Sequence, residues 1–322
     1  MMVKQPLLIV AGPTASGKTA LAVQLAKAFD AEVISADSMQ VYRDISIGTA
    51  RPTPEEMDGV PHHLVGFLSL SETFSVADFA QLAREKICEI AGRGRLPLVA
   101  GGTGLYLSAL VDHLDFDSGA SDPDLRRRLE EEAACSGAEA LLERLRALDP
   151  DYAAQLHPHN LKRLIRALEL ALLTGKTREQ READSRREES PYQPILLGIA
   201  FENRQLLYER IDRRVDQMLS NGLVEEARLV LHAGASQTAL QAIGYKELFP
   251  YLLGKEPLET AAARLKQESR RYAKRQMTWL RRMKGIHWLY RDQLGGEQAL
   301  FEAARDVAAA CLAALEHPGT PS

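Results

Sequence analysis

The chain has 322 residues, of which 45% are hydrophobic and 26% are charged, and its formal net charge is −4 at pH 7. This length exceeds that of a typical single core, so we expect one large domain with an insertion, or two domains. The composition is that of a soluble globular protein, and the small negative charge excludes a general attraction to nucleic acid. Any RNA binding must therefore depend on local basic patches.

No stretch of the sequence has the length and apolar character of a membrane span. The first apolar run leads directly into a glycine-rich loop, so it is expected to be a core strand and not a signal peptide. We therefore expect a cytoplasmic protein that does not associate with membranes.

Cysteine and histidine spacing argues against a metal or disulfide framework. Cys88, Cys135 and Cys311 are far apart, so they are expected to be small buried apolar residues. The adjacent His62 and His63 invite a metal interpretation. Neighbouring residues of a strand point to opposite faces, however, and no third ligand follows at a suitable spacing, so a structural role is favoured.

The first predicted element is a strand at residues 7–11, and a phosphate-binding loop follows it at once. The loop reads Gly12-Pro13-Thr14-Ala15-Ser16-Gly17-Lys18-Thr19. Its glycines let the backbone curve into a cradle of N–H donors, the lysine adds a positive charge, and the Thr19 hydroxyl can reach a bound Mg²⁺. A helix over residues 20–29 then turns its positive end toward the anion. The pattern predicts that the chain holds a polyphosphate.

Two further strands are predicted at residues 32–36 and 96–100, with a helix between them. Ser75 and Asp78 form a capping-box pattern that begins this helix, which extends to about residue 91. The alternation of strands and helices predicts a parallel sheet that is covered on both faces.

Polar or glycine-rich loops follow these two strands, with the sequences Asp37-Ser38-Met39-Gln40 and Gly101-Gly102-Thr103-Gly104. The carboxyl ends of parallel strands meet at one edge of a sheet, which is where ligands bind in such folds. We therefore expect Asp37 and Thr103 to lie near the phosphate-binding loop.

The pattern then becomes charged, strand-poor and helical from about residue 114 to residue 191. Asp122-Pro123 and Asp149-Pro150 predict helix starts within it. A β-like run at residues 195–201 returns to the sheet, and helices are expected to fill the remainder. The predicted domains are thus residues 1–113 (first part of the core), 114–191 (helical insertion) and 192–322 (core completion and basic C-terminal helices).

Residues 264–284 form the most basic region, with nine Lys or Arg residues and one acidic residue. Leu265, Tyr272 and Trp279 recur at helical spacing, so basic residues such as Arg271 and Arg275 fall on a different face. Such a face is either simply solvated or suited to the phosphates of a nucleic acid, and this feature alone leaves both interpretations open.

In order and spacing, the motifs of this chain resemble those of the bacterial tRNA dimethylallyltransferases, also called tRNA isopentenyltransferases. The resemblance extends from about residue 7 to residue 288. Besides the phosphate-binding loop, it depends on Ala36-Asp37-Ser38-Met39-Gln40-Val41-Tyr42, Gly101-Gly102-Thr103-Gly104-Leu105-Tyr106, Arg163-Leu164-Ile165-Arg166-Ala167-Leu168-Glu169, Ala242-Ile243-Gly244-Tyr245-Lys246-Glu247 and Arg271-Tyr272-Ala273-Lys274-Arg275-Gln276.

The resemblance implies an α/β fold: a P-loop NTPase-like core with a parallel sheet flanked by helices, and an all-helical insertion domain that grips the anticodon stem-loop. One departure from the family pattern is His157-Pro158-His159-Asn160, where the family usually has asparagine at the third position. Asn160 can still cap the following helix, so only a direct contact from position 159 is affected.

The family transfers a dimethylallyl group from dimethylallyl diphosphate to N6 of adenosine 37, beside the anticodon, in tRNAs reading codons that begin with U. For this chain the resemblance implies the products N6-dimethylallyladenosine and diphosphate, with Mg²⁺ as cofactor. The substrates would be tRNA and dimethylallyl diphosphate, and the protein would be a monomer without an obligate protein partner. The phosphate-binding loop would then hold a diphosphate leaving group.

Three residues receive chemical roles. Asp37 resembles the family's general base, although its chemistry alone would equally suit a water-mediated Mg²⁺ ligand or a turn cap. Thr103 resembles the residue beside the reacting adenine, where a hydroxyl helps position N6 or the leaving oxygen, or it caps a helix. Arg214 aligns with a diphosphate-binding arginine, and the alternative is a surface ion pair with Asp212 or Asp216.

The resemblance also assigns residues to tRNA binding, in a reaction that must extrude the target base into the enzyme. Arg163 and Arg166 lie three apart on one predicted helical face, as a phosphate clamp requires. The full set is Asp37, Ser38, Met39, Gln40, Thr103, Arg126, Lys162, Arg163, Arg166, Gln241, Gly244, Tyr245, Lys246, Arg271, Lys274, Arg275 and Gln276.

Three other functions remain as alternatives. A small-molecule P-loop kinase would usually need an acidic Mg²⁺ ligand at the end of another strand, yet the third strand ends in Ala100-Gly101-Gly102. An RNA-binding protein switched by a nucleotide would leave Asp37 without a task. An adenylate isopentenyltransferase, which prenylates free nucleotides, would need neither the helical insertion nor the long basic helix.

Overall fold

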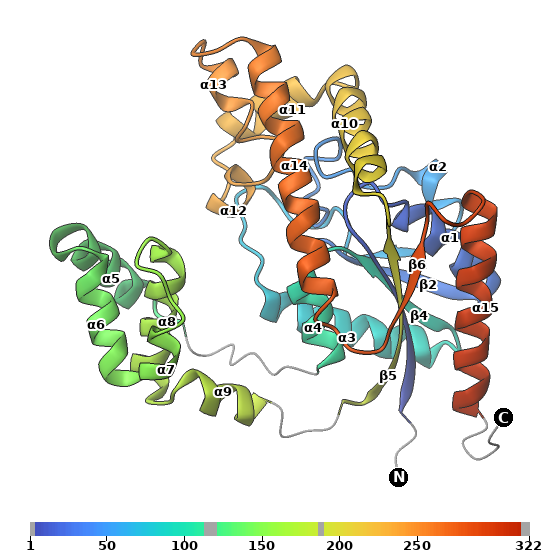
Figure 1. Ribbon diagram of the computed structural model, residues 1–322, viewed down its shortest axis with the longest axis horizontal. Coiled ribbons are helices and arrows are strands. Elements are labelled where there is room, and N and C mark those ends of the chain that lie inside the picture. The colour runs from blue at the N-terminus through green and yellow to red at the C-terminus, as the bar shows by residue number, and fades with distance from the viewer. Residues whose placement is uncertain (1–3, 113–120, 186–189, 317–322) are drawn as a thin grey trace. The chain divides into compact units, whose positions relative to one another are not determined.

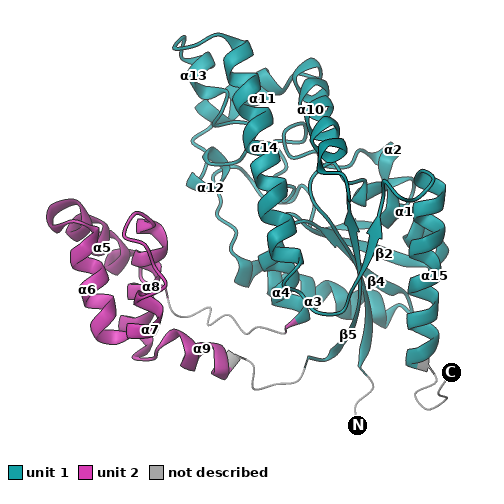
Figure 2. Cartoon of the chain, in the orientation of Figure 1, with its two compact units in different colours: residues 1–111, 190–322 teal, residues 112–189 magenta. Residues whose placement is uncertain are grey.

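The computed structural model of the protein describes residues 4–112, 121–185 and 190–316. The chain divides into two compact units (Figure 2). The core unit comprises residues 1–111 and 190–322, and the insertion unit comprises residues 112–189. The predicted insertion limits of 114 and 191 fall beside these divisions, and residue 114 lies outside the described residues.

A six-stranded sheet runs through the core unit (Figure 1). The strand order is β3-β2-β4-β1-β5-β6, and every neighbouring pair is parallel. The predicted parallel sheet and its four predicted strands are therefore confirmed. The strands are β1 (Gln5–Ala11), β2 (Ala31–Ala36), β3 (His62–His63), β4 (Leu96–Gly101), β5 (Tyr192–Ala200) and β6 (Ile286–Tyr290).

Neither edge strand is among the four predicted strands of the sheet, although His62 and His63 are treated above as neighbours on a strand. The expectation that helices fill the chain after residue 201 is wrong, because β6 pairs with β5 over residues 286–290. β3 is only two residues long, and in β6 only Leu289 is buried, while His287 and Tyr290 are exposed. Such short edge segments have no strong intrinsic pattern, so pairing with a neighbouring strand decides their conformation.

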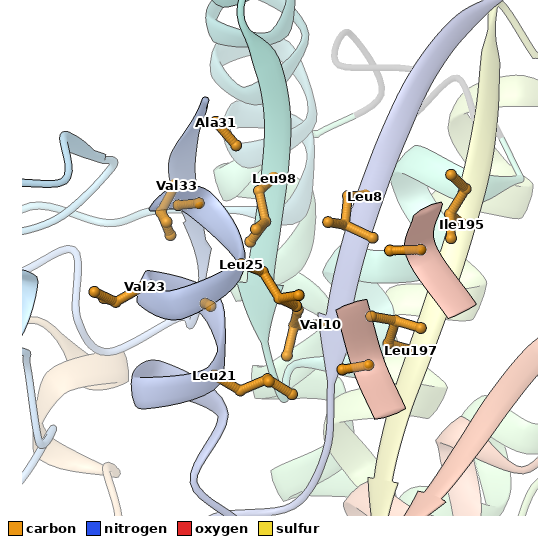
Figure 3. Packing of buried hydrophobic residues seen from close by; sticks show 14 of the residues in the cluster. Leu8, Val10, Leu21, Val23, Leu25, Ala31, Val33, Leu98, Ile195 and Leu197 are labelled. Atoms are coloured by element: carbon orange, nitrogen blue, oxygen red, sulfur yellow. The ribbon is translucent and has the colours of Figure 1, made fainter. Parts of the chain in front are cut away.

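Two layers of helices cover the sheet (Figure 1). On one face, Leu8 and Val10 of β1 pack in a cluster with α1 (Lys18–Ala28) and α15 (Glu297–Glu316), as Figure 3 shows for the α1 side. On the other face, Leu7 and Ile9 pack with α3 (Val76–Gly92) and α4 (Gly104–Val111). Each such buried side chain contributes about 1.5–3 kcal/mol relative to exposure. A central strand buried on both faces explains the unbroken apolar run of β1.

The capping box predicted at Ser75 is confirmed, because its hydroxyl accepts the Asp78 N–H while Asp78 accepts the Ser75 N–H. The Asp37 and Thr103 loops do share the edge of the sheet that carries the phosphate-binding loop. The Thr103 N–H donates to the Ala36 carbonyl at 3.3 Å, and a Cβ on Gly102 would lie 2.9 Å from the Gly12 carbonyl oxygen.

The basic helix predicted in the C-terminal region is α14 (Leu258–Leu280), which packs against α10 (Arg204–Ser220). Two ion pairs join these helices, Arg270 with Asp212 at 2.5 Å and Lys266 with Asp216 at 2.6 Å. The predicted basic region extends to residue 284, whereas α14 ends at Leu280 and is followed by β6 and α15. The remaining helices of the core unit are α2 (Pro54–Met57), α11 (Leu223–His232), α12 (Gln237–Leu240) and α13 (Phe249–Leu252).

The described part of the insertion unit contains helices and no strand. Asp122 and Asp149 cap helices as predicted, each accepting backbone N–H groups. Asn160 stands at the helix start but makes no side-chain capping bond, which corrects the expectation for it. The helices are α5 (Pro123–Ser136), α6 (Ala138–Leu148), α7 (Pro150–Ala153), α8 (Leu161–Thr174) and α9 (Arg178–Ser185).

The cysteines are not buried apolar residues. Cys88 and Cys135 are exposed and Cys311 is half-buried. Cys88 follows the fully buried Ile87 on α3, and one step along a helix turns the next side chain by about 100°, here toward solvent. Among the described residues, no helix is long and apolar enough to cross a membrane.

Candidate active site

The phosphate-binding loop joins β1 to α1 and has two residues in the left-handed region, Ala15 at φ 61° and Gly17 at φ 94°. The Lys18 ammonium donates to the Pro13 carbonyl at 2.7 Å across the loop. Ser16 is fully buried, and its hydroxyl oxygen has no hydrogen-bond partner among the described residues. An unpaired buried hydroxyl is costly, so this loop has a polar group suited to a ligand.

Lys18 is strongly perturbed. Burial, and after it the positive charge of Arg214, lower the pKa of the Lys18 ammonium to about 7, while Asp37 acts in the opposite direction. Near neutral pH the charged and the neutral form of this lysine are therefore both populated. A polyphosphate bound beside it would favour the charged form and raise its pKa again.

Asp37 follows β2, and its two carboxylate oxygens differ in their hydrogen bonding. Oδ1 accepts the N–H of Met39 at 2.9 Å and of Gln40 at 3.4 Å, which closes the turn. Oδ2 accepts no hydrogen bond from the described residues, and Asp37 lines the pocket. The side chain thus caps its turn and still has one carboxylate oxygen available. The Thr103 hydroxyl accepts the N–H of Ser38 at 3.3 Å, so it supports the same turn and does not cap α4.

α14 is tied to two loops of this edge by one buried side chain, Gln276. Its Oε1 accepts the Thr14 N–H at 2.8 Å, and its Nε2 donates to the Gly102 carbonyl at 3.0 Å. A Cβ at Gly102 would collide with the Gln276 amide, so this position requires glycine for the close approach. One turn before it on the same helix, Tyr272 lies near Asp37. Burial, and then the Asp37 charge, raise the pKa of Tyr272 to about 12, so its hydroxyl stays protonated.

Arg214 extends from α10 into the pocket. The surface ion pairs considered for it do not form, because Asp212 binds Arg270 and Asp216 binds Lys266. Burial lowers the pKa of Arg214, while the charges of Asp37 and Glu56 act against this shift. An arginine guanidinium remains charged under such conditions, so Arg214 supplies a fixed cation beside Lys18.

A pocket of about 1420 Å³ extends over these groups within the core unit. Eight of its lining residues are Lys or Arg and two are acidic, Asp37 and Glu56. The volume exceeds that of a typical small-molecule site, so it has room for a diphosphate and a second substrate group. The basic lining residues are Lys18, Arg43, Arg51, Arg210, Arg213, Arg214, Lys246 and Arg275.

The structure brings most of the predicted core-unit residues to this pocket. Those that line it are Thr14, Ala15, Ser16, Gly17, Lys18, Thr19, Asp37, Ser38, Met39, Gln40, Arg214, Gln241, Gly244, Lys246, Arg275 and Gln276.

Six predicted residues of the core unit do not line the pocket: Gly12, Pro13, Thr103, Tyr245, Arg271 and Lys274. Tyr245 is fully buried, and its hydroxyl donates to Glu226 at 2.8 Å, so its side chain supports the surrounding loops. Arg271 lies on the exposed surface of α14, where it pairs with Glu268 at 2.6 Å. Lys274 is also exposed.

Several residues that line the pocket are not predicted from the sequence. Tyr272 fits the apolar face of its predicted helix, although it stands inside the Arg271–Gln276 motif that could have identified it. Arg210 and Arg213 precede Arg214 on α10 by four residues and by one residue, and this spacing is a usable signal. Arg43 and Arg51 carry no motif, since only the folding of the loop after β2 brings them to the pocket.

In the insertion unit, the predicted clamp residues Arg163 and Arg166 have different partners. Arg163 donates to the Tyr152 hydroxyl at 3.0 Å. Arg166 and Arg126 instead share the fully buried Glu169, each at 2.8 Å. Burial alone would raise the pKa of Glu169, but the hydrogen bonds from Arg166 and Arg126 outweigh it and lower that pKa.

Lys162, the remaining predicted residue of this unit, is exposed.

Comparison with known proteins agrees with this architecture. The family model described as IPP transferase matches residues 40–283. A protein of Bacillus velezensis named tRNA dimethylallyltransferase is 49% identical over 286 residues, which cover 88% of this chain and 90% of that one. The crystal structure of a full-length tRNA isopentenylpyrophosphate transferase from Bacillus halodurans is similar with a TM-score of 0.72 and 43% identity, covering 98% of this chain and 100% of the other.

A structure of a eukaryotic dimethylallyltransferase acting on tRNA is similar with a TM-score of 0.80 and 30% identity, covering 98% of this chain and 80% of the other. Both the sequence relatives and the solved structures thus span nearly the whole chain. The chain belongs to the IPP transferase family.

Proposed function

We propose that this protein is a tRNA dimethylallyltransferase, which transfers a dimethylallyl group from dimethylallyl diphosphate to N6 of adenosine 37 in tRNAs reading UNN codons. The products are N6-dimethylallyladenosine and diphosphate. The observation that carries this proposal is the basic pocket of the core unit, which is lined by the phosphate-binding loop, by Asp37 and by the exposed Arg275 of α14. The names of its close relatives support the same reaction.

Asp37 acts as the general base. The lone pair of adenine N6 is delocalised into the ring, so the amine attacks carbon effectively only while a carboxylate accepts its proton. The Oδ2 atom of Asp37 suits this task because Oδ1 alone holds the turn. The neighbouring Tyr272 hydroxyl would help to position N6, and the Thr103 hydroxyl would help to position Asp37 through the turn that it supports.

The bond between the allylic carbon and oxygen breaks as N6 attacks, and negative charge accumulates on the departing diphosphate. Preorganised cations and N–H groups stabilise such charge more effectively than water does. Residues 12–19 provide the N–H groups and the Lys18 ammonium, and Arg214 provides a second cation in the same pocket.

Magnesium would complete this set. The residues present fit Mg²⁺ in a phosphate site, where the ion takes one or two protein oxygens and completes its shell with phosphate oxygens and water. Thr19 lines the pocket, and the buried Ser16 hydroxyl lacks a partner among the described residues. Thr19 would hold the ion, and a bound Mg²⁺ would neutralise negative charge on the diphosphate.

Transfer RNA would be held by exposed basic residues that surround the pocket and by those of the insertion unit. Arg271, Lys274 and Arg275 lie on the exposed surface of α14. Phosphate contacts of this type position a nucleic acid without reading its sequence. The target adenine must leave its stack to reach Asp37, and the pocket volume of about 1420 Å³ is large enough to receive it.

We place the protein in the cytoplasm, acting as a monomer without an obligate protein partner or membrane. Two other reactions are less consistent with its features. A free-nucleotide isopentenyltransferase gives no task to the insertion unit or to the exposed basic residues of α14. A small-molecule kinase would call for an acidic metal ligand, and β4 ends in Gly101.

Mass spectrometry of nucleosides tests the proposal. Unmodified tRNA with an A36-A37-A38 loop is incubated with protein, Mg²⁺ and dimethylallyl diphosphate, in parallel with a reaction that contains AMP. N6-dimethylallyladenosine from the tRNA alone is the expected result. Product from AMP alone would assign the chain to the free-nucleotide enzymes, and no product from either would reject the proposed reaction.

A further inference from the structure

Two arginines hold backbone carbonyl groups of the phosphate-binding loop. The Arg291 Nη1 donates to the Ser16 carbonyl at 3.2 Å, and the Arg210 Nε donates to the Ala15 carbonyl at 2.9 Å. In a planar trans peptide the carbonyl of one residue and the N–H of the next point in opposite directions. Holding the Ser16 carbonyl therefore directs the Gly17 N–H away from Arg291, on a residue that lines the pocket.

The position of Arg291 is fixed by two other elements. It directly follows β6, and its own N–H donates to the Ala200 carbonyl at 3.0 Å, which continues the pairing of β6 with β5. Its Nη2 donates to Glu297, the first residue of α15, at 2.7 Å. The side chain is only 11% exposed. The guanidinium is thus fixed by the sheet and by α15 before any ligand is present.

The loop is shaped to accept this side chain. A Cβ at Gly17 would collide with the Arg291 guanidinium. Glycine at this position therefore allows both the left-handed backbone conformation and the close approach of Arg291. Arg291 does not line the pocket, in contrast to Arg210. Its effect on a ligand must therefore pass through the loop backbone and through its charge.

We propose that Arg291 is a positioning residue of the diphosphate site, which fixes the Ser16–Gly17 peptide so that its N–H faces the bound diphosphate. This inference rests on the proposed function, because it assumes that the phosphate-binding loop binds diphosphate. The family model matches residues 40–283, so Arg291 lies beyond the matched range. The proposal therefore extends the diphosphate site to the segment that follows β6.

Binding of inorganic diphosphate to the full-length protein, measured by calorimetry without tRNA, tests this role. Arg291→Met removes the donor, whereas Arg291→Lys keeps one donor and the charge. Arg305→Met is the matched control, because Arg305 is an exposed arginine on α15 that pairs with Asp306. Arg291 acts on the diphosphate only through the loop backbone and its charge, so the loss should be smaller than that of a direct charged hydrogen bond. We expect a dissociation constant about five- to ten-fold higher for Arg291→Met and about two- to three-fold higher for Arg291→Lys.

The affinity for tRNA and the melting temperature of the Lys variant should remain those of the unmodified protein. Unchanged diphosphate affinity in Arg291→Met, or an equal loss in Arg305→Met, would overturn the proposal. If Arg291→Met does not fold, unchanged affinity in Arg291→Lys overturns it instead. Since no prenyl transfer is measured, failure of the proposed reaction would leave this result interpretable.

Discussion

At the scale of single residues, Asp37 performs two tasks that substitution can separate. Asp37→Asn keeps an Oδ1 acceptor for the Met39 N–H but cannot take a proton from N6. We expect kcat to fall by about 10²–10⁴-fold with little change in tRNA affinity. Single-turnover kinetics and tRNA titration measure both quantities. An Asp37→Asn enzyme with normal turnover would remove the general-base assignment.

Lys18 gives diphosphate binding a pH dependence with a definite sign. Burial and the Arg214 charge lower the pKa of Lys18 to about 7, and a bound diphosphate would raise it. Below pH 7 the lysine is already charged, whereas above it the ligand must bring a proton into the site. We therefore expect affinity to decrease as the pH rises from 7 to 9.

Calorimetry in buffers of different ionisation enthalpy measures the proton uptake that accompanies this binding. Lys18→Met serves as the reference, because its remaining pH dependence belongs to the diphosphate itself. Identical pH profiles for the two proteins would contradict the assignment.

At the scale of elements, α14 is attached to the sheet edge through Gln276. Gln276→Ala would leave the Thr14 N–H and the Gly102 carbonyl without their partner. Unsatisfied buried groups cost about 1–3 kcal/mol, so we expect the free energy of unfolding to fall by that amount. Denaturant unfolding measures the loss. The exposed Lys274→Ala on the same helix should show almost none, and equal effects of the two substitutions would argue against the bridge.

The exposed surface of α14 should contribute to tRNA binding through phosphates. Each phosphate contact that is lost lowers the slope of log affinity against log salt by about 0.7–0.9. We expect this change for Arg271→Ala and for Arg275→Ala, measured by filter binding between low and physiological salt. Arg305→Ala on α15 is the control, and an unchanged slope in both α14 variants would show that their face is only solvated.

At the scale of the whole molecule, the division into two units predicts that ligands stabilise them unequally. The described residues that line the diphosphate pocket belong to the core unit. A ligand present at 100 times its dissociation constant stabilises the unit that binds it by about 2.7 kcal/mol. We expect diphosphate to raise the calorimetric transition of the core unit and to leave that of the insertion unit unchanged. Equal shifts of the two transitions would mean that the units unfold together.

The sequence by itself determined the elements whose signals are local. Continuous apolar runs predicted β1, β2, β4 and β5, because strands buried on both faces need no polar positions. The phosphate-binding loop and its helix follow from glycine conformation and from spacing. Because parallel strands present their carboxyl ends at one edge of a sheet, the sequence also predicts that Asp37 and Thr103 lie close together.

Only the tertiary structure decided the features that depend on distant partners. β3 and β6 become strands through pairing, and Arg43 and Arg51 reach the pocket through the course of their loop. The partners of Arg163 and Arg166 differ although the two residues share a helix. Sequence spacing describes neighbours along the chain, whereas these contacts join residues that only the folded backbone brings together.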